Sequence, residues 1–495
     1  MNYAAAERET QALGISRRDF CRFGAAATAA LLAGTAARSQ WEKRRMNILL
    51  ITADDLGTEL GCYGDPYAVT PHLDHLASRG VLFECGYVTQ ASCSPSRSSM
   101  FTGLYPHQNG QVGLAHLGYS MRPGQQTIPT LLKEAGYRTG TLGKVHVGPG
   151  HAFSWDLDDE MGVVGTRDVR LVAERAEAFI ASSGETPFFL MVNFFDPHRP
   201  FEGADQIDGI PAKPLGPDDV RPFPFLLVDS PKVRSDTATY YNCAERLDTG
   251  VGLLMDLLER LGHDEDTLVL FIGDHGAPFT RAKAACYEAG VHIPYLMYWP
   301  GKTRPGVRSN ALVSTVDLMP TILGAAGVPC PETEGRDLAA LASGEDVPWR
   351  DTLCTEYNSH IPRDFFPRRS IRDDRFKLIH NLLSGKENPV RGIDGCAAWE
   401  TAQAERYDGT LAREVYDRYS NPPEFELYDL RNDPHEFRNL ADDAQYAETL
   451  LDLQQRLRAW RESTGDPFLD EDTLNDWTQR HQGLKDLDPW DGSAP

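Results

Sequence analysis

The sequence lacks the features that mark several common classes of protein. It has no internal repeat and no extended low-complexity tract, which argues against a solenoid and a disordered chain. Its nine cysteines are scattered without a C-x-x-C pair, so neither a zinc ribbon nor a redox motif is indicated. A chain of 495 residues needs no disulfide framework, although one or two bridges are possible outside the cytoplasm. The length of the chain predicts two or three compact units, and 41% hydrophobic residues give enough apolar material for a core.

Positive charge is also scarce. Lysine and arginine number 49 against 72 aspartates and glutamates, which leaves a formal net charge of −23. An acidic surface repels nucleic acids and anionic membranes, so we expect neither as a partner. The same charge would repel a polyanionic substrate. Any site for an anion therefore needs a local cluster of Lys, Arg and His side chains.

The start of the chain has the pattern of an export signal. The paired arginines Arg17 and Arg18 precede an alanine-rich run from Gly24 to Ala37, which ends in small residues suited to a signal peptidase. This run has about 14 residues, whereas a membrane-spanning helix needs about 20. The pattern resembles the twin-arginine class, and a chance amphipathic tail is the alternative. We therefore predict a signal peptide over residues 1–39 and a bacterial protein that is periplasmic or secreted, with no membrane anchor in its mature form.

After Met46, short apolar runs alternate with longer helical patterns. The runs that predict buried parallel strands are Asn47–Ala53, Thr139–Gly143, Phe188–Phe194 and Thr267–Gly273. Helices are predicted over Asp168–Ser182 and Thr237–Leu261. This alternation indicates an α/β fold with a mainly parallel sheet, in a domain that we place at residues 46–345. Ligands of such sheets bind beyond the carboxyl ends of the strands.

The pattern changes beyond residue 345. Strand-like pieces at Phe376–Leu383 and Glu426–Leu430 are followed by a helical pattern over Ala447–Arg461. We interpret residues 346–470 as a smaller α+β subdomain with an antiparallel sheet. The remaining residues, 471–495, are rich in Asp, Gly and Trp and are predicted to form a polar tail.

Acidic residues follow two of the predicted strands. Asp54 and Asp55 come directly after the first strand, and Asp274 and His275 follow the strand that ends at Gly273. If both clusters meet at one edge of the sheet, their oxygens suit Ca²⁺, which takes about six to eight oxygen ligands. A nitrogen ligand such as His275 is more usual for transition metals. An aspartate pair after a strand is also a common turn or helix cap, so the residues leave both interpretations open.

Cationic and proton-donating residues follow the other two strands. Lys144 and His146 come after the second predicted strand, and His198 comes after the third. Taken singly, each histidine is more often structural than catalytic. Together with Lys283, these residues would form the local positive cluster that an anionic substrate requires on an acidic protein.

Cys93 stands just before Pro95, at the predicted first turn of a helix. The N-terminus of a helix favours an anion or a nucleophilic atom beside it. On residue types alone, Cys93 could be an ordinary thiol of low pKa. Periodicity and spacing leave its role open.

The sequence C-S-P-S-R that begins at Cys93, followed five residues later by T-G, resembles the signature of type I sulfatases. In that family, a maturation enzyme oxidises the cysteine to formylglycine. Further motifs occur in the family's order, namely DDLG, GKVHVG, DPHRP, GDHG, Lys283 followed by YEAG, and ELYDL. The resemblance covers about residues 46–465. It implies an alkaline-phosphatase-like α/β fold and a formylglycine (3-oxoalanine) at Cys93, made by a formylglycine-generating enzyme.

The resemblance also implies roles for the residues that match these motifs. The calcium ligands would be Asp54, Asp55, Asp274, His275 and the modified Cys93. At the position of His275, many members of the family carry asparagine. The catalytic residues would be Arg97 and Lys144, which hold the formylglycine, His146, a base that acts on its hydroxyl, and His198 and Lys283, which grip the sulfate and handle the leaving group.

Within this family, the resemblance is strongest to the heparan N-sulfatases, also called sulfamidases or N-sulfoglucosamine sulfohydrolases. It rests on stretches such as HVGP, FDPHR, FKLIHNL and DPHE. The substrate that this implies is a sulfated saccharide, with the N-sulfate of glucosamine in heparan or heparin fragments as the first candidate, and the process is glycosaminoglycan degradation. Candidate sugar contacts are Asp196, His107 and His360. For the two histidines, a loop residue bonded to backbone is an equally good interpretation.

Two residues keep an alternative function open. Lys283 stands where sulfamidases tend to carry arginine, and His275 is more typical of iduronate-type O-sulfatases. A carbohydrate O-sulfatase is therefore the alternative. A phosphonate or phosphodiester hydrolase on the same scaffold would share the metal site. A non-catalytic carbohydrate-binding protein would have little reason to keep every charged position together.

Overall fold

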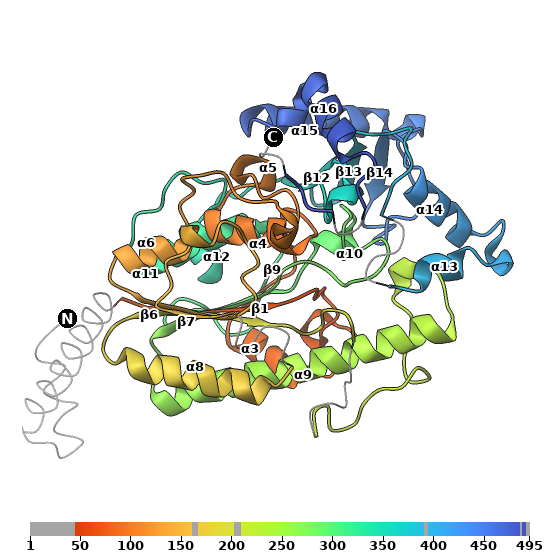
Figure 1. The fold of residues 1–495 in the computed structure, drawn as a ribbon. Coiled ribbons are helices and arrows are strands. Elements are labelled where there is room, and N and C mark those ends of the chain that lie inside the picture. The colour runs from red at the N-terminus through yellow and green to blue at the C-terminus, as the bar shows by residue number, and fades with distance from the viewer. Residues whose placement is uncertain (1–44, 161–166, 202–208, 391–394, 486–487, 492–495) are drawn as a thin grey trace, which may run out of the picture. The chain divides into compact units, whose positions relative to one another are not determined.

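The computed structural model describes residues 45–160, 167–201, 209–390, 395–485 and 488–491. Residues from Asn47 onward form one compact unit (Figure 1). The predicted signal peptide, residues 1–39, lies outside the described residues. Within the described ranges, no helix is both long and apolar enough to span a membrane. The eight cysteines in these ranges are all free thiols.

An eight-stranded sheet runs through the centre of this unit, in the strand order β5-β4-β6-β1-β7-β8-β2-β9. Strands β5, β4, β6, β1 and β7 are mutually parallel, whereas β8 runs antiparallel to both of its neighbours. The predicted α/β fold with a mainly parallel sheet is therefore confirmed. The strands are β1 (Asn47–Ala53), β2 (Val81–Phe83), β4 (Arg138–Gly143), β5 (Leu157–Asp159), β6 (Phe188–Phe194), β7 (Thr267–Gly273), β8 (Tyr295–Tyr298) and β9 (Val307–Ser309).

The middle strands of this sheet are buried because helices cover both of its faces. Every residue of β1, β6 and β7 is buried, as their nearly continuous apolar runs predict. Helices α3 (Pro71–Arg79), α8 (Val169–Ser183) and α9 (Pro231–Leu261) lie on one face, and α4 (Cys93–Thr102), α6 (Ile128–Glu134) and α11 (Leu318–Ala326) lie on the other (Figure 1). Shorter elements are α5 (Pro106–Asn109), α10 (Glu288–Val291), α12 (Ala339–Ala342) and a two-stranded sheet of β3 (Gly86–Tyr87) and β10 (Val313–Ser314).

The predicted limits hold for the central strands and differ at the longest helix. Strands β1, β6 and β7 begin and end at the predicted residues. Helix α9 begins at Pro231 rather than at Thr237. The side chain of Ser230 accepts a hydrogen bond from the backbone N–H of Val233, and proline fits the first turn of a helix. These local signals start the helix before its apolar face begins.

A second sheet of four antiparallel strands follows in the chain, as predicted for the C-terminal part. Its order is β11 (Leu353–Tyr357), β12 (Arg368–Arg372), β13 (Phe376–Asn381) and β14 (Phe425–Asp429). Helix α15 (Ala447–Ser463) packs against β12 and β13. Between β13 and β14 the chain forms α13 (Ala398–Ala402) and α14 (Leu411–Ser420). The domain limits near residues 345 and 470 stay predictions.

Strand β12 was not predicted, because its sequence, RRSIR, is mostly arginine and shows no apolar pattern. All of its residues are nevertheless buried. Arg369 donates to both carboxylate oxygens of Asp466 at 2.8 Å, and Arg372 donates to Glu288 at 2.7 Å. Buried charges are tolerated where they are paired and hydrogen-bonded, so the partners of these arginines make the strand possible.

The segment expected as a polar tail contains helix α16 (Glu471–His481). Asp470 caps this helix by accepting a hydrogen bond from the backbone N–H of Thr473. Trp477 and Trp490 are buried, and their ring centroids lie 4.9 Å apart. These tryptophans are isolated among polar residues, so the sequence shows no apolar period that would predict their burial.

Candidate active site

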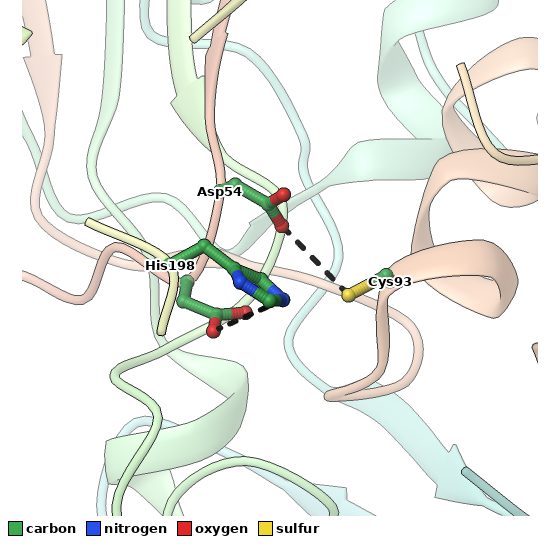
Figure 2. A group of neighbouring side chains, drawn as sticks. Asp54, Cys93 and His198 are labelled. Carbon is green, nitrogen blue, oxygen red and sulfur yellow. Dashed lines mark hydrogen bonds and ion pairs between the residues drawn. The ribbon is translucent and has the colours of Figure 1, made fainter. Parts of the chain in front are cut away.

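Cys93 is the first residue of helix α4 and faces the end of the central sheet (Figure 2). Its Sγ atom lies 3.7 Å from Oδ1 of Asp54 and 3.4 Å from Nε2 of His275. Only 2% of the residue is exposed. The N-terminus of a helix carries partial positive charge, so this position favours a negatively charged atom.

The register of the parallel strands brings the acidic residues together. Ala53, at the end of β1, lies opposite Gly273, at the end of β7. The backbone N–H of Asp274 donates to the carbonyl of Ala53 at 2.9 Å, and the N–H of Asp55 donates to Oδ1 of Asp274 at 2.9 Å. Asp55 has a φ of 68°, in the left-handed region that few residues other than glycine adopt. The predicted meeting of Asp54, Asp55 and Asp274 at one edge of the sheet is therefore present, with all three carboxylates buried.

His275 directs its Nε2 atom into this acidic cluster. Its Nδ1–H donates to the carbonyl of Gly276 at 2.9 Å, since a carbonyl can only accept. Nε2 lies 3.0 Å from Oδ1 of Asp55. Burial alone would lower the pKa of His275, but the carboxylates of Asp274 and Asp55 raise this pKa well above its ordinary value. The Nε2 position therefore favours a positive species, either a proton or a metal cation, and a backbone anchor on the other nitrogen is typical of metal-binding histidines.

The donor atoms around Cys93 have the spacing of a metal site. Within each of two overlapping groups, the ligand atoms all lie within 4.8 Å of one another. Burial and repulsion from Asp54 raise the pKa of Asp274 to about 7. A divalent cation between these carboxylates would remove that repulsion, so the residues fit a metal ion of this charge. The two groups are Asp54, Asp55, Cys93 and His198, and Cys93, Asp274 and His275.

Cationic side chains surround the same centre. Nζ of Lys144 lies 2.7 Å from Oδ2 of Asp54, and Nζ of Lys283 lies 3.0 Å from Oδ2 of Asp55. Nε2 of His198 lies 3.9 Å from Oδ2 of Asp55 (Figure 2). Burial alone would raise the pKa of the Cys93 thiol, but Lys144 and Lys283 hold this pKa well below its ordinary value. The local positive cluster that the acidic composition requires for an anionic substrate is thus found here.

Arg97 is fully buried one turn along α4 from Cys93. It donates to Oδ2 of Asp274 at 2.9 Å, to the carbonyl of Lys144 at 2.8 Å and to Oδ1 of Asn193 at 3.0 Å. Its Nη2 atom is buried and donates no hydrogen bond among the described residues. An oxygen on the side chain of residue 93, in place of sulfur, is the kind of acceptor that this free donor lacks.

Asn193 is a site residue that sequence reasoning missed. It is the one amide within the apolar strand β6. Its Oδ1 accepts hydrogen bonds from Thr52 at 2.6 Å and from Arg97 at 3.0 Å, so it ties β1 and α4 to β6. A lone polar residue in a buried run was the signal that could have identified it, because a buried amide needs partners.

His146 stands at the edge of this centre and contacts a second histidine. Its backbone has a φ of 54°, and its N–H donates to Oε1 of Glu160 at 3.1 Å. Hydrogen bonds with His146 and His198 contribute to the low pKa of Cys93, after the larger effects of burial, Lys144 and Lys283. Nε2 of His146 lies 2.7 Å from Nδ1 of His116. Sequence reasoning missed His116, since an isolated histidine in a glycine-containing loop carries no signal of its own.

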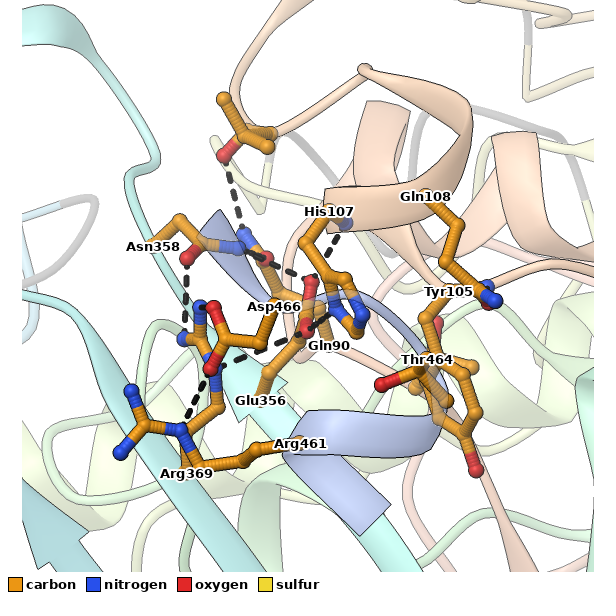
Figure 3. A network of polar contacts seen from close by, with 12 residues as sticks. Gln90, Tyr105, His107, Gln108, Glu356, Asn358, Arg369, Arg461, Thr464 and Asp466 are labelled. Carbon is orange, nitrogen blue, oxygen red and sulfur yellow. Dashed lines mark hydrogen bonds and ion pairs between the residues drawn. The ribbon is translucent and has the colours of Figure 1, made fainter. Parts of the chain in front are cut away.

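Two of the three candidate sugar contacts are occupied by protein partners. Asp196 is 2% exposed, and both of its oxygens accept hydrogen bonds from Arg246, at 2.7 and 2.9 Å, while Arg167 also pairs with it. His107 is buried in α5, where its backbone N–H donates to Glu356 at 2.9 Å and its ring pairs with the same carboxylate. Figure 3 shows His107 inside a network with Asn358, Arg369 and Asp466. In this structure, Asp196 is a buried ion-pair partner of arginines, and His107 is buried in contact with the carboxylate of Glu356.

His360 lies beside the segment that carries Cys93. Its Nδ1 is 2.9 Å from Oγ of Ser92, the residue before Cys93. It is 7% exposed and follows β11 of the C-terminal sheet. Of the three candidate sugar contacts, His360 is therefore the one that is brought to the Cys93 segment.

Comparisons with known proteins agree with this geometry. The sequence profile of the sulfatase family matches residues 46–328, and that of the C-terminal part of N-sulphoglucosamine sulphohydrolase matches residues 273–388. The chain is 33% identical to human N-sulphoglucosamine sulphohydrolase over 86% of this chain and 92% of the relative. It is also 31% identical to human arylsulfatase A, over 80% and 83% of the two chains.

Solved structures share the fold at lower identity. One, described in complex with its substrate D-glucosamine-2-N,6-O-disulfate, has a TM-score of 0.65 at 20% identity and covers 85% of this chain and 98% of that chain. The phosphonate monoester hydrolase of Agrobacterium radiobacter has a TM-score of 0.64 at 20% identity and covers 85% and 96%. The alkaline-phosphatase-like fold expected from the sequence is confirmed. Together with the family profile and the relative of 33% identity, these findings show that the chain belongs to the sulfatase family, whose members hydrolyse sulfate esters or sulfamates.

Proposed function

We propose that this protein is a calcium- and formylglycine-dependent sulfatase that removes the N-sulfate of glucosamine from heparan or heparin fragments. The observation that carries the proposal is the similarity to N-sulphoglucosamine sulphohydrolase, which extends over the catalytic motifs and into the C-terminal part of the chain. The buried anion site around Cys93 supports it, since a sulfate group needs clustered cations on a protein of net charge −23.

Cys93 is proposed to be oxidised to formylglycine during maturation. A hydrated aldehyde carries two hydroxyls on one carbon, of which one can attack sulfur and the other can expel sulfate and restore the aldehyde. The cysteine side chain seen here marks the position of that group. Nη2 of Arg97, which makes no hydrogen bond among the described residues, lies 3.8 Å from Oδ1 of Asp54, and Lys144 holds its ammonium group against the other oxygen of Asp54.

Lys283 and His198 lie where they can interact with the negative charge of a sulfate group. Lys283 and His198 both lie beside Asp55 and interact with Cys93, so they can neutralise sulfate oxygens as the bond to sulfur breaks. Burial would lower the pKa of His198, but Asp55 and Asp54 raise it. A protonated His198 can therefore give its proton to the departing nitrogen or oxygen. His146 is the proposed base on the hydroxyl of the modified residue.

Calcium would be held by Asp54, Asp55, Asp274, His275 and an oxygen of the modified Cys93. Bound there, the cation would supply Lewis-acid activation of the nucleophile and would offset the charge of the three buried carboxylates. The inward Nε2 of His275 replaces an oxygen ligand with nitrogen, which is compatible with binding but unusual for calcium.

A carbohydrate O-sulfatase is the second candidate, because a specific residue favours it. The sulfate-gripping position carries Lys283, whose ammonium pairs with Asp55 at 3.0 Å. Lysine offers a point charge, whereas arginine offers a planar pair of donors, so the two residues suit different sulfate geometries.

A substrate panel separates these functions. The mature protein, produced together with a formylglycine-generating enzyme, is assayed for sulfate release from N-sulfoglucosamine, 6-O-sulfated glucosamine and 2-O-sulfated uronic acid, and for hydrolysis of a phosphonate monoester. We expect kcat/KM for the N-sulfate to exceed the others by about tenfold or more, because a site built for one polar group rejects analogues strongly. Higher kcat/KM on an O-sulfate would replace the proposal by the O-sulfatase, and preference for the phosphonate would remove both.

We also propose that the protein is exported through a twin-arginine signal over residues 1–39. The support is the arginine pair Arg17-Arg18 before a weakly apolar run. Replacing both arginines by lysine should leave the full-length precursor in the cytoplasmic fraction of a bacterial host, whereas the unaltered chain should reach the periplasm or the medium.

A further inference from the structure

His116 lies on the short helical turn η2 (Ala115–Leu117) and is the exposed neighbour of His146. Nδ1 of His116 is 2.7 Å from Nε2 of His146. The two imidazole rings stack with their centroids 4.9 Å apart and an interplanar angle of 24°. A hydrogen bond between two imidazoles requires that one nitrogen carries the hydrogen and the other accepts it. The contact therefore constrains both the ring orientation and the tautomer of His146.

The turn that carries His116 is fastened to the nucleophile's helix. The backbone N–H of Ala115 donates to Oγ of Ser94 at 3.0 Å, and Ser94 is the residue after Cys93. The N–H of Leu114 donates to the carbonyl of His360 at 3.0 Å. These two hydrogen bonds attach the backbone of the turn to the start of α4 and to His360, and so fix the place from which the His116 side chain reaches His146.

Trp490, near the end of the described residues, contacts the last residue of the same turn. The N–H of Trp490 donates to the carbonyl of Leu117 at 2.7 Å. Gly118 has a φ of 96°, and a Cβ atom on it would lie 2.0 Å from the carbonyl oxygen of Trp490. Only glycine permits this approach of the two backbones.

The ring of Trp490 stacks on two other aromatic rings. Its centroid lies 4.1 Å from that of His481 and 5.7 Å from that of Tyr119, which follows the turn directly. Stacked aromatic pairs of this kind contribute about 0.5–1.5 kcal/mol beyond the area they bury. His481, the last residue of α16, and Trp490 therefore form a clamp on the η2 turn, and we call these two residues the C-terminal clamp.

We propose that His116 is a positioning residue that holds the imidazole of His146 in its reactive orientation, and that the C-terminal clamp keeps His116 in place. This inference rests on the proposed function, in which His146 acts on the hydroxyl of the modified Cys93. The backbone of His146 is fixed by Glu160, but its ring needs a partner of its own to select one rotamer and one tautomer. A displacement of about 1 Å in a reacting group can cost about 100-fold in rate, so a modest loss of order in this ring has a large effect.

The first test replaces His116 by Phe and by Asn. Phenylalanine keeps the ring and removes the hydrogen bond, and we expect kcat to fall by about 10- to 100-fold with KM changed less than about threefold. The amide of asparagine can reproduce the Nδ1 hydrogen bond, so His116→Asn should recover most of kcat. His151→Phe is the matched control, because His151 is an exposed loop histidine in η3 (Gly150–Ala152).

The second test addresses the clamp. Trp490→Ala should lower kcat less than His116→Phe does, with the melting temperature recorded alongside. If the clamp acts through His116, the double variant His116→Phe/Trp490→Ala is no slower than His116→Phe alone, because the effects of two residues on one pathway do not add. Additive losses in kcat would contradict the clamp.

Three results would overturn the role of His116. A rise in KM at unchanged kcat in His116→Phe would make it a substrate contact, and wild-type kcat in that variant would remove any role in turnover. The ¹⁵N NMR signals of the His146 ring give a readout that needs no substrate, and we expect them to shift in His116→Phe and not in His151→Phe. If the unaltered protein released no sulfate, the proposed function would fail, whereas unshifted His146 signals would contradict the positioning role by itself.

Discussion

Nε of Arg97 lies 2.9 Å from Oδ2 of Asp274, with both side chains fully buried. This ion pair joins the helix that begins at Cys93 to the end of strand β7. Asp274 also accepts a hydrogen bond from the backbone N–H of Asp55, so the pair sets the distance between the start of α4 at Cys93 and the acidic cluster. The geometry of the site therefore depends on a contact that no single element contains.

Loss of Arg97 should damage both stability and catalysis. Arg97→Met leaves Asp274 buried without its partner, and removing one member of a buried pair costs about 3–5 kcal/mol. We expect a corresponding fall in the free energy of unfolding measured in urea, together with loss of turnover. Arg260→Met is the control, since Arg260 pairs with Glu177 on the surface, and it should leave the unfolding midpoint unchanged.

Oxidation of Cys93 is the first chemical property to measure. A peptide that spans Gln90–Arg97 should weigh about 18 Da less than the encoded sequence, the loss expected when a thiol becomes an aldehyde. Cys93→Ala should abolish turnover, and its circular dichroism spectrum should match that of the unaltered protein. An unmodified peptide from an active preparation, or activity in Cys93→Ala, would contradict the mechanism.

Removal of calcium should lower stability as well as activity. A ligand present at about 100 times its dissociation constant stabilises the native state by about 2.7 kcal/mol. EGTA should therefore lower the melting temperature, and added Ca²⁺ should restore it. Asp274→Asn should make the melting temperature much less sensitive to EGTA. An identical melting temperature with and without chelator, at confirmed loss of metal, would exclude a structural calcium.

The pH dependence of stability should contain a contribution from Asp248 in α9. Burial raises the pKa of its carboxyl from 3.8 to about 7, although it accepts the backbone N–H groups of His72 and Leu73. A carboxyl whose pKa is higher in the folded state favours folding fully below about pH 4, and that contribution disappears as the pH rises through 7.

As the pH rises from 4 to 7, the free energy of unfolding of the unaltered protein should therefore fall relative to that of Asp248→Asn. The shift corresponds to at most about 4 kcal/mol, and urea unfolding at several pH values measures it. Asp256→Asn, at an exposed position of the same helix, is the control and should show a constant difference over this range. A pH-independent difference for Asp248→Asn would show that its carboxyl stays ionised.

His107 should matter for folding and not for substrate binding. Its ring pairs with Glu356 inside the network of Figure 3, so His107→Phe leaves a buried carboxylate with fewer partners. We expect a loss of about 1–3 kcal/mol in the free energy of unfolding. KM for the sulfated sugar should be unchanged. A raised KM with unchanged stability would restore His107 as a sugar contact.

Much of the central sheet could be predicted, because its physical signals are local. A short, continuous apolar run such as Asn47–Ala53 is typical of an inner strand that is covered on both faces. The antiparallel C-terminal sheet was predicted from β13 and β14, whereas β12 was not. Its arginines can be buried because they pair with Asp466 and Glu288, which are far away in the sequence.

The sequence by itself determined which residues could form the site. Asp54, Asp55 and Asp274 follow apolar strands, and parallel strands end at the same edge, so their convergence followed from the pattern. The sequence could not show that Asp196 and His107 are buried and paired rather than exposed at the surface. Whether a polar side chain is free or already paired depends on partners such as Arg246 and Glu356, which only folding brings near.

Only the tertiary structure joined His116 to His146 and placed Trp490 on the turn between α5 and α6. These contacts connect segments that share no periodicity, because each is made by one or two residues in a loop. Periodic patterns report which face of an element is buried and carry no information on which loops meet. The fold class was therefore predictable along the chain, and the resemblance of the C-S-P-S-R segment pointed to Cys93, while the contacts of His116 with His146 and of Trp490 with the turn are made only in the folded protein.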